Sequence, residues 1–386
     1  MIKDINLFYF YNSRGEPSIK TEILTENGIF SAMCGTGKSR GKWEKKTFNV
    51  KNSIENFLKI KKQFLGISEK DWKYFDSLLE KQKNIGAELT TPLSISCLRA
   101  ATKNQIYNLF EKKSFNFPYP LSNVLGGGAH GGSTSIQEFL IIPSKAKSFP
   151  EAVSLVINVW KSVQKEFKKK GFIAGRNDEG AWLTRENELK TLDMLSKITE
   201  DFGCDIGLDF AATQFYKHGF YYYPFLGKKF NSEQQFDFVL NLIKTYKLKY
   251  VEDPFHENAF SSFSDLRKRV GICISGDDLY CTQPDRIKLG VAKSSTSGII
   301  IKPDQAGTIS KTLEAINIAK ENNMDIIVSH RSGETCDYFI SDFSLAVDAK
   351  FIKCGVGGGE RIVKLNRLIE LWYKLERPKM VKINYL

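Results

Sequence analysis

The first fifty residues alternate between apolar and polar positions, a period typical of strands in a sheet with one buried face. The run INLFYFY is followed by a turn at 12–15, and a second run, SIKTEILTENGIFSAM, contains a Glu-Asn-Gly turn signal. From about 52 to 115 the apolar period lengthens to that of amphipathic helices, as in DWKYFDSLLEKQ. Strands followed by helices predict a small α+β domain over residues 1–115.

Beyond residue 120, short apolar runs alternate with longer amphipathic ones. The short runs are apolar almost throughout, as parallel strands buried on both faces are. Segments with a helical period, such as SEQQFDFVLNLIKTY and ISKTLEAINIAKENN, separate them. Repeated β-then-α units predict a β/α barrel or an open doubly wound sheet for residues 120–386. The six strand candidates are DIGLDF, LKYVEDP, GICISGDDL, SGIIIKPD, MDIIVSHRS and AKFIKCG.

Each of these six strands ends in a residue that can bind a metal, move a proton or hold an anion. In a β/α barrel the carboxyl ends of all strands open onto one face, so residues far apart in sequence would converge there. For any one of these residues, the fact that the strand leaves the core at that point explains a charged side chain as well as a functional role does. The ordered set is harder to explain in that way: Asp209, Glu252, Asp277, Lys302, His330 and Lys353.

The three acids come first and form a hard-oxygen site suited to Mg²⁺, with too few soft or imidazole ligands for zinc. Lys302 and Lys353 are expected on the opposite arc, because a charged lysine cannot bind a metal. A nearby divalent cation would lower the pKa of a lysine from about 10.4 toward neutrality and make it a general base. These residues therefore predict abstraction of a proton next to a carboxylate.

Composition narrows the class of protein. No stretch of the 386 residues approaches the roughly 20 uninterrupted apolar residues that cross a bilayer, so we expect a cytoplasmic protein without a membrane partner. The seven cysteines include no CxxC pair, which argues against a disulfide framework or a zinc site. The formal charge of +12 is spread over short lysine runs, as on a solvated surface, and does not indicate a nucleic-acid partner.

Several motifs resemble those of the enolase family. VEDPF, SGDDL, IKPDQAGT and VSHRSGETCDYFISD follow one another in the order of that family's barrel strands. Further matches are NSRGEP, GGGAHGG, IQEFLIIP, DEG and GLDFAATQFY, so that the resemblance covers nearly the whole chain. It implies an enolase-type β/α barrel over 120–386 and an N-terminal α+β lid or capping domain over 1–115. A lysine base with one or two Mg²⁺ ions is that superfamily's known way of stabilising an ene-diolate.

The resemblance also implies roles for individual residues. Lys302 would take the proton from C2 of 2-phospho-D-glycerate, and Glu179 would protonate the departing C3 hydroxyl to give phosphoenolpyruvate. Glu138 matches the second glutamate of the acid side, and Lys353 the lysine facing the substrate carboxylate. Two Mg²⁺ ions per site are implied, with the ligands Asp209, Glu252, Asp277 and, for the second ion, Ser39. The implied substrate contacts are His330, Arg331, Ser332, Lys353 and His130, the last on a Gly-rich lid loop.

Departures from the family pattern surround the substrate rather than the proton-transfer groups. Pro303 and Asp304 stand where the family usually has Val-Asn, and CGVGGGER lacks the usual Arg-Ser. Two other functions therefore stay open. A paralogue could dehydrate a phosphono or carboxyphospho analogue, as a carboxyphosphoenolpyruvate synthase does, or the chain could be a non-catalytic binding protein of the same fold. The resemblance also implies a homodimer, with Arg14 as a candidate contact.

Overall fold

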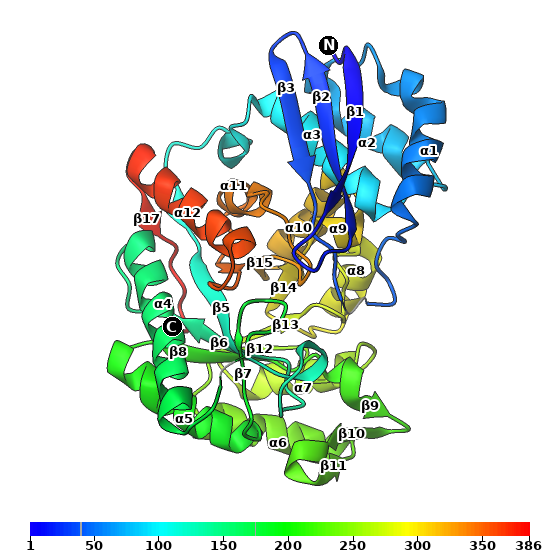
Figure 1. The fold of residues 1–386 in the computed structure, drawn as a ribbon. Helices are drawn as coiled ribbons and strands as arrows, with labels where there is room; N and C mark the ends of the chain where they lie inside the picture. The colour runs from blue at the N-terminus through cyan, green and yellow to red at the C-terminus, as the bar shows by residue number, and fades with distance from the viewer. Residues whose placement is uncertain (39–40, 174) are drawn as a thin grey trace.

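The structure is a computed structural model that describes residues 1–38, 41–173 and 175–386. Ser39, the residue assigned by resemblance to a second Mg²⁺, lies outside the described residues. Figure 1 shows two parts, an N-terminal domain and a larger domain built around one closed sheet. No helix in the described ranges combines the length and apolar character needed to span a bilayer.

The N-terminal domain is an antiparallel meander covered by helices. Its strands pair in the order β1-β2-β3, and Gly28, with a φ of +122°, forms the tight turn between the last two. The helices bury a core that includes Phe57, Phe75 and Leu89 against Ile5 and Ile23 of the sheet. The elements are β1 (Asp4–Tyr11), β2 (Pro17–Thr25), β3 (Gly28–Met33), α1 (Val50–Ile60), α2 (Trp72–Glu80) and α3 (Ala87–Thr102).

The larger domain is a closed barrel of eight strands, which excludes the open-sheet alternative because the last strand pairs with the first. Six strands coincide with the predicted runs, but the prediction lacked the first two. The second of these runs antiparallel to both its neighbours, so the pair has no intervening helix and does not show the β-then-α pattern. The strands are β5 (Tyr119–Gly126), β6 (Glu138–Ile142), β8 (Asp205–Asp209), β12 (Tyr250–Glu252), β13 (Cys273–Gly276), β14 (Gly298–Ile301), β15 (Asp325–Ser329) and β16 (Phe351–Lys353).

Amphipathic helices surround this barrel, and their apolar faces share a core with the outward side chains of the strands, such as Ile299, Ile301 and Ile352. The barrel helices are α4 (Phe149–Lys169), α5 (Glu188–Phe202), α6 (Ser232–Thr245), α7 (Phe260–Arg269), α8 (Pro284–Ala292), α9 (Pro303–Ala306), α10 (Ile309–Glu321), α11 (Phe339–Ala346) and α12 (Gly359–Lys374). Short strands outside the barrel wall are β4 (Asn116–Phe117), β7 (Trp182–Leu183), β9 (Tyr216–Lys217), β10 (Phe220–Tyr223), β11 (Lys228–Phe230) and β17 (Lys379–Met380).

The inside of the barrel is divided along its axis into an apolar floor and a charged mouth. Because side chains on one face of a strand recur every second residue, Ile300 of the floor lies one inward position below Lys302, and Phe351 lies one below Lys353. Strand register aligns Glu252 and Glu138 with Asp209, which places three carboxylates in one row. The mouth is thus a direct product of the strand pattern.

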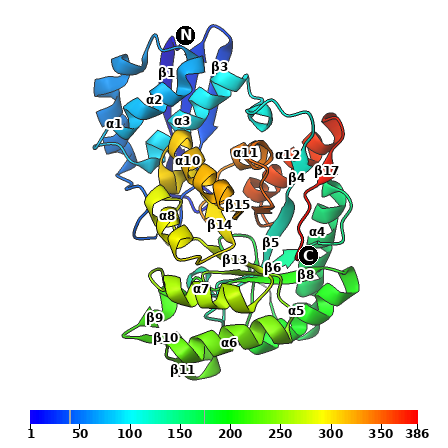
Figure 2. The same cartoon turned by 180° about the vertical axis from the view of Figure 1, so that it is seen from behind.

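The two domains are joined at the start of α10, which lies beside α2 and α3 in the view of Figure 2. Asp76 accepts hydrogen bonds from the backbone and hydroxyl of Ser310, both at 2.8 Å. Ser94 accepts from the Ile309 amide at 2.9 Å, and the Thr308 hydroxyl donates to Glu80 at 2.6 Å. The first turn of a barrel helix is therefore capped by side chains of the N-terminal domain.

Candidate active site

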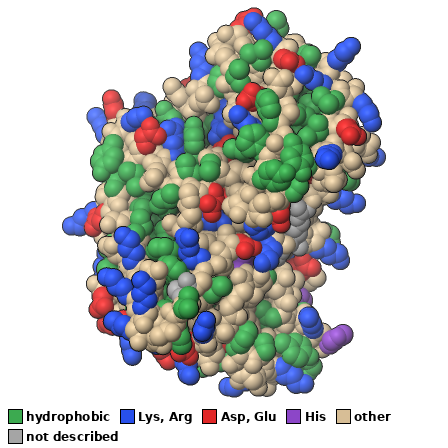
Figure 3. Space-filling model, viewed as in Figure 1, with side chains coloured by type: hydrophobic (Ala, Val, Ile, Leu, Met, Phe, Trp, Pro, Cys, Tyr) green, Lys and Arg blue, Asp and Glu red, His purple; other side chains and the backbone are tan. Residues whose placement is uncertain are grey.

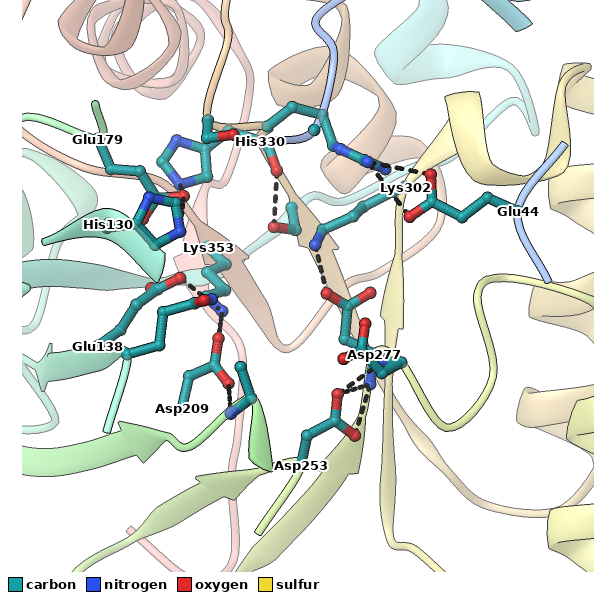
Figure 4. Close-up of a pocket in the computed structure, with 17 residues that line it drawn as sticks. Glu44, His130, Glu138, Glu179, Asp209, Asp253, Asp277, Lys302, His330 and Lys353 are labelled. Carbon is teal, nitrogen blue, oxygen red and sulfur yellow. Dashed lines mark hydrogen bonds and ion pairs between the residues drawn. The ribbon is translucent and has the colours of Figure 1, made fainter. Parts of the chain in front are cut away.

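Most of the predicted site residues line one cavity at the barrel mouth, shown in Figure 4. Ten of the predicted residues line it: His130, Glu138, Glu179, Asp209, Asp277, Lys302, His330, Arg331, Ser332 and Lys353. Glu252 does not line the cavity itself, but it contacts Lys353, which does. The structure therefore brings together residues that span more than two hundred positions of the sequence. Most of them stand at the carboxyl ends of parallel barrel strands, whereas Glu138 begins the antiparallel β6 and His130 and Glu179 lie in connecting segments.

The row of carboxylates is bridged by Lys353. Its Nζ lies 2.8 Å from Asp209 Oδ2, 2.9 Å from Glu252 Oε1 and 3.3 Å from Glu138 Oε1. These three acids raise the pKa of Lys353 well above its usual range, although burial acts in the opposite direction. Burial and the neighbouring Asp209 raise the pKa of Glu252 to about 8. As expected, Lys353 comes from the arc opposite the acids, because β16 lies four strands from β12 in the closed barrel. Its side chain reaches across the mouth to contact them, since buried carboxylates need a cation at contact distance.

Lys302 makes the corresponding contact on the other side of the mouth, where its Nζ pairs with Asp277 Oδ2. Burial disfavours the ammonium, but Asp277 outweighs burial, so the pKa of Lys302 is raised. A lysine in this state holds its proton, and it becomes a base only when another cation balances Asp277. The prediction of a lowered pKa concerns Lys302 beside a bound divalent cation, and it stays a prediction.

Two glutamates and two histidines form the side of the cavity facing Lys302 (Figure 4). His130 Nε2 and His330 Nε2 each lie 3.8 Å from Glu179 Oε1. Burial and the adjacent Glu179 raise the pKa of Glu138 well above its usual range. Although burial opposes it, the surrounding cationic groups hold the pKa of Glu179 well below its usual range. These opposite shifts favour a shared proton on Glu138 rather than on Glu179.

Arg331 occupies the edge of the cavity nearest the N-terminal domain. Its Nη2 donates to both Glu44 oxygens, at 3.2 and 3.1 Å, and its Nη1 lies 3.0 Å from Asp304 Oδ2. Ser332 Oγ beside it accepts from Arg14 Nη1 at 2.7 Å and from the Lys38 amide at 2.8 Å. Arg14, expected at a dimer contact, is therefore engaged within its own chain.

Residues 114–379 match the family model described as Enolase, C-terminal TIM barrel domain. The enolase of Archaeoglobus fulgidus is 35% identical over 99% of this chain and 100% of that protein. The enolase of Methanosphaera stadtmanae is 34% identical over 99% of both chains, and that of Halorubrum lacusprofundi is 35% identical over 96% of this chain and 98% of the other.

The chain belongs to the enolase family. This membership agrees with the resemblance drawn from the motifs and with the closed barrel. It also gives a context for side chains that the motifs did not single out.

Arg361 is the most deeply buried of these additional groups. Its guanidinium donates to His330 Nδ1 at 2.9 Å, to the Arg331 carbonyl at 3.0 Å and to the Ser332 carbonyl at 2.7 Å, and it also contacts the Asp178 carbonyl. It thereby joins the loop after β15 to the turn that carries Glu179. Because His330 Nδ1 accepts this bond, the ring proton lies on Nε2, facing Glu179. In the sequence, Arg361 follows three glycines in GGGER, and this segment was the one available hint of a functional arginine.

The donor set of this enolase-family site suits a divalent metal. Seven of the described residues that line the cavity carry a carboxylate and three carry a lysine or arginine, which leaves an excess of buried negative charge. That excess is visible in Asp278, whose pKa burial and the neighbouring Asp277 raise to about 7. One oxygen of Glu138 is buried without a hydrogen-bond partner. Hard oxygen donors with uncompensated charge fit Mg²⁺.

The position of the ammonium groups explains one detail of the acid cluster. Within the described ranges, His130, Glu138 and Glu179 are the group of possible ligands whose donor atoms all lie within 4.8 Å of one another. Asp209, Glu252 and Asp277 do not form such a group, because Lys353 contacts the first two and Lys302 contacts the third. Binding of a cation among these three acids would therefore require both lysines to withdraw.

Proposed function

We propose that the protein dehydrates 2-phospho-D-glycerate to phosphoenolpyruvate in a reaction that requires Mg²⁺. The observation that carries this proposal is the division of one cavity between a lysine and a glutamate pair. Lys302 approaches from β14, and Glu138 and Glu179 approach from the opposite side (Figure 4). A base and an acid on opposite faces of a bound hydroxy acid are what β-elimination of water needs. The curated relatives are named enolase.

Lys302 would act as the base of this reaction. Its Nζ accepts the proton from C2, and the electron pair of the C–H bond moves toward the substrate carboxylate. Asp209, Glu252 and Asp277, with Ser39 for a second ion, would hold Mg²⁺, which when bound supplies positive charge to that carboxylate. Lys353, which contacts Asp209 and Glu252 and would withdraw from them when the cation binds, adds a further positive charge on the same side.

The glutamate pair would complete the elimination. The electron pair from C2 returns to form the C2–C3 double bond while the C3–O bond breaks and its electron pair leaves with the hydroxyl. The one proton held by Glu138 and Glu179 converts that hydroxyl to water. Glu179 receives the Glu138 proton and faces the substrate with His130 and His330 at its side. Arg331 and Ser332 would bind the phosphoryl group, for which the planar guanidinium is suited.

The decisive experiment is a substrate panel with and without Mg²⁺, followed through the ultraviolet absorbance of an enol phosphate product. We expect turnover of 2-phospho-D-glycerate that stops when Mg²⁺ is chelated. The Glu179→Gln variant should lose at least about 100-fold in kcat, because an amide cannot pass on the proton. Glu360→Gln, which changes a partly exposed glutamate next to Arg361, is the matched control and should retain most activity.

A related substrate is the second candidate, and Asp304 beside Arg331 is the observation that favours testing it. A carboxylate at the phosphoryl end of the cavity alters the charge that a substrate meets there. The panel therefore includes a phosphono and a carboxyphospho analogue of the acid. Turnover of an analogue without turnover of 2-phospho-D-glycerate would move the assignment to that analogue.

We also propose that the chain forms a homodimer through the N-terminal sheet. Strand β1 lies at the edge of that sheet and exposes a run of aromatic side chains, of which Tyr11 is 63% exposed. Figure 3 shows hydrophobic side chains gathered over the N-terminal domain. Sedimentation analysis of the protein and of a Phe8→Ser/Phe10→Ser variant tests this proposal; equal masses for the two at a monomer's value would refute it. The other exposed residues of this surface are Phe8, Tyr9, Phe10 and Ile29.

A further inference from the structure

The guanidinium of Arg331 is held between two carboxylates that come from different domains. Glu44 reaches it from the segment that follows β3, and Asp304 reaches it from α9, directly after Lys302. The arginine is 5% exposed, and its backbone is fixed separately, since its amide donates to Glu334 at 2.9 Å. One buried positive charge thus faces two negative charges. A third anion that approached this arginine would be repelled by both carboxylates.

The two carboxylates are not held equally. Glu44 also accepts from Gln305 Nε2 at 3.2 Å and from the Gly41 amide at 3.1 Å. For Asp304, the described part of the chain shows one ion pair, that with Arg331, and no side-chain hydrogen bond. The geometry of the pair is also incomplete, because Arg331 Nη1 has no hydrogen-bond partner although Asp304 Oδ2 lies 3.0 Å away. Asp304 is therefore the partner that an incoming ligand can displace.

We propose that Asp304 is a specificity-determining residue that competes with the phosphoryl group of the substrate for the Arg331 guanidinium. This inference rests on the proposed function, in which Arg331 receives that group. A charged Asp304 weakens binding of the phosphoryl group, and a neutral Asp304 releases Nη1 to donate to it. The site then discriminates among phosphorylated acids by charge, favouring a phosphoryl group with one negative charge over the same group with two.

The surroundings place the ionisation of Asp304 in the range where phosphate monoesters also ionise. Burial raises the pKa of Asp304 to about 6, with Glu44 adding to the shift and Arg331 opposing it. Phosphate monoesters take up their second negative charge near pH 6 as well. Affinity should therefore fall as the pH rises through this value. The titratable or charged groups that face Asp304 are Cys34, Glu44, Lys302, Arg331, Glu334, Asp337 and Lys364.

The test measures anion binding and catalysis in Asp304→Asn, with and without Mg²⁺. Sulfate is the first probe, since its charge is constant between pH 5 and 8, so that any pH dependence belongs to the protein. We expect sulfate to bind the wild-type protein about tenfold more weakly at pH 8 than at pH 5.5, and Asp304→Asn to remove most of that difference. KM for 2-phospho-D-glycerate at pH 8 should fall about tenfold in the variant, with kcat changed less than about threefold.

Asp304→Ser is measured in parallel, so that misfolding of one variant leaves the other. Asp265→Asn, at a 60% exposed carboxylate on α7, controls for the change in net charge and should match the wild type. Sulfate affinity that is flat with pH in the wild type, weaker sulfate binding by the variants, or a fall in kcat at constant KM would each overturn the inference. Absence of turnover with pH-dependent sulfate binding intact would instead count against the proposed function alone.

Discussion

The mouth and the floor of the barrel are built from the same strands and have opposite character. At the mouth, buried carboxylates and lysines face one another, and the pKa values of Glu138, Glu252 and Asp278 are raised because burial and like charges disfavour ionisation. Lower in the barrel, apolar side chains such as Ile300 and Phe351 fill the interior, and Val381, Ile383 and Leu386 from the last segment of the chain close it from below. Stability and chemistry are thus separated along the barrel axis.

The buried charges of the mouth lower the stability of the folded state, and the apolar packing of the floor offsets this loss. Every ionised carboxylate at the mouth has lost water and regains only part of that interaction from lysines. The floor meets its few polar groups with direct partners: the Tyr385 hydroxyl donates to Asp325 at 2.6 Å, and Lys249 donates to the Tyr385 carbonyl at 3.2 Å. Changes at the mouth should therefore alter activity and its pH dependence, whereas changes at the floor should alter stability alone.

The largest expected effect is the loss of the base. Lys302→Ala should lower kcat by about 10⁴-fold, because the variant loses the group proposed to accept the C2 proton. The measurement is steady-state turnover of 2-phospho-D-glycerate with saturating Mg²⁺. Circular dichroism confirms the fold of the variant. A kcat within tenfold of the wild type would show that this lysine is not the base.

The second effect is a loss of stability with rising pH in metal-free protein. A carboxyl group whose pKa is higher in the folded than in the unfolded state binds more protons when folded, so stability falls as the pH rises between the two values. For Glu252 this window runs from about 4.5 to about 8. We expect the contribution of Glu252 to the free energy of unfolding to drop by about 5 kcal/mol across it, and Mg²⁺ to restore more stability at pH 8 than at pH 6.

Urea unfolding at several pH values, with and without Mg²⁺, measures this dependence. Glu252→Gln is the informative variant, since an amide in place of the carboxylate should flatten the metal-free profile. A profile that rises with pH, or one that Glu252→Gln leaves unchanged, would refute the assignment of this buried acid as a source of strain.

The third effect concerns the floor. Ile300→Ala, one inward position below Lys302, should lower the free energy of unfolding by about 3 kcal/mol by leaving a cavity in a fully buried cluster. The loss should be the same at pH 6 and pH 8, and kcat of the folded enzyme should stay within about threefold of the wild type. A large fall in kcat at unchanged stability would show that floor and mouth are not separate.

The smallest effect should come from Tyr385→Phe. The variant removes one hydrogen bond between the last segment of the chain and Asp325, which should cost about 1 kcal/mol. Thermal unfolding would detect this, and turnover should be unchanged. If the variant is as stable as the wild type, the last segment stabilises the fold through its apolar contacts and not through this hydrogen bond.

The sequence predicted the mouth better than the barrel that forms it. The six β-then-α strands were recognisable because each apolar run ends in a charged residue, and family membership and the closed eight-strand barrel confirm the predicted fold class. Strands β5 and β6 were not recognised as barrel strands, since they form an antiparallel pair joined by a glycine-rich loop. Sequence spacing places residues at a mouth but does not specify how the mouth closes.

The contacts between side chains within the site could not be predicted from the sequence either. Glu44 and Arg361 reach it from outside the strand ends, and nothing in their spacing indicates the contacts with Arg331 and His330. The contact of Lys353 with Asp209 follows from charge balance, which depends on burial and therefore on the finished fold. The roles assigned to the individual site residues remain predictions for the experiments above to decide.

The contacts at the start of α10 show that the barrel matched by the family model is not independent of the residues before it. The barrel model of the family begins at residue 114, yet the polar groups of the first turn of α10 find their partners in Asp76, Glu80 and Ser94, which precede that boundary. A barrel excised at residue 114 would expose this turn just beyond the loop that carries Lys302. The barrel defined by the family model thus depends on residues outside it to cap one of its helices.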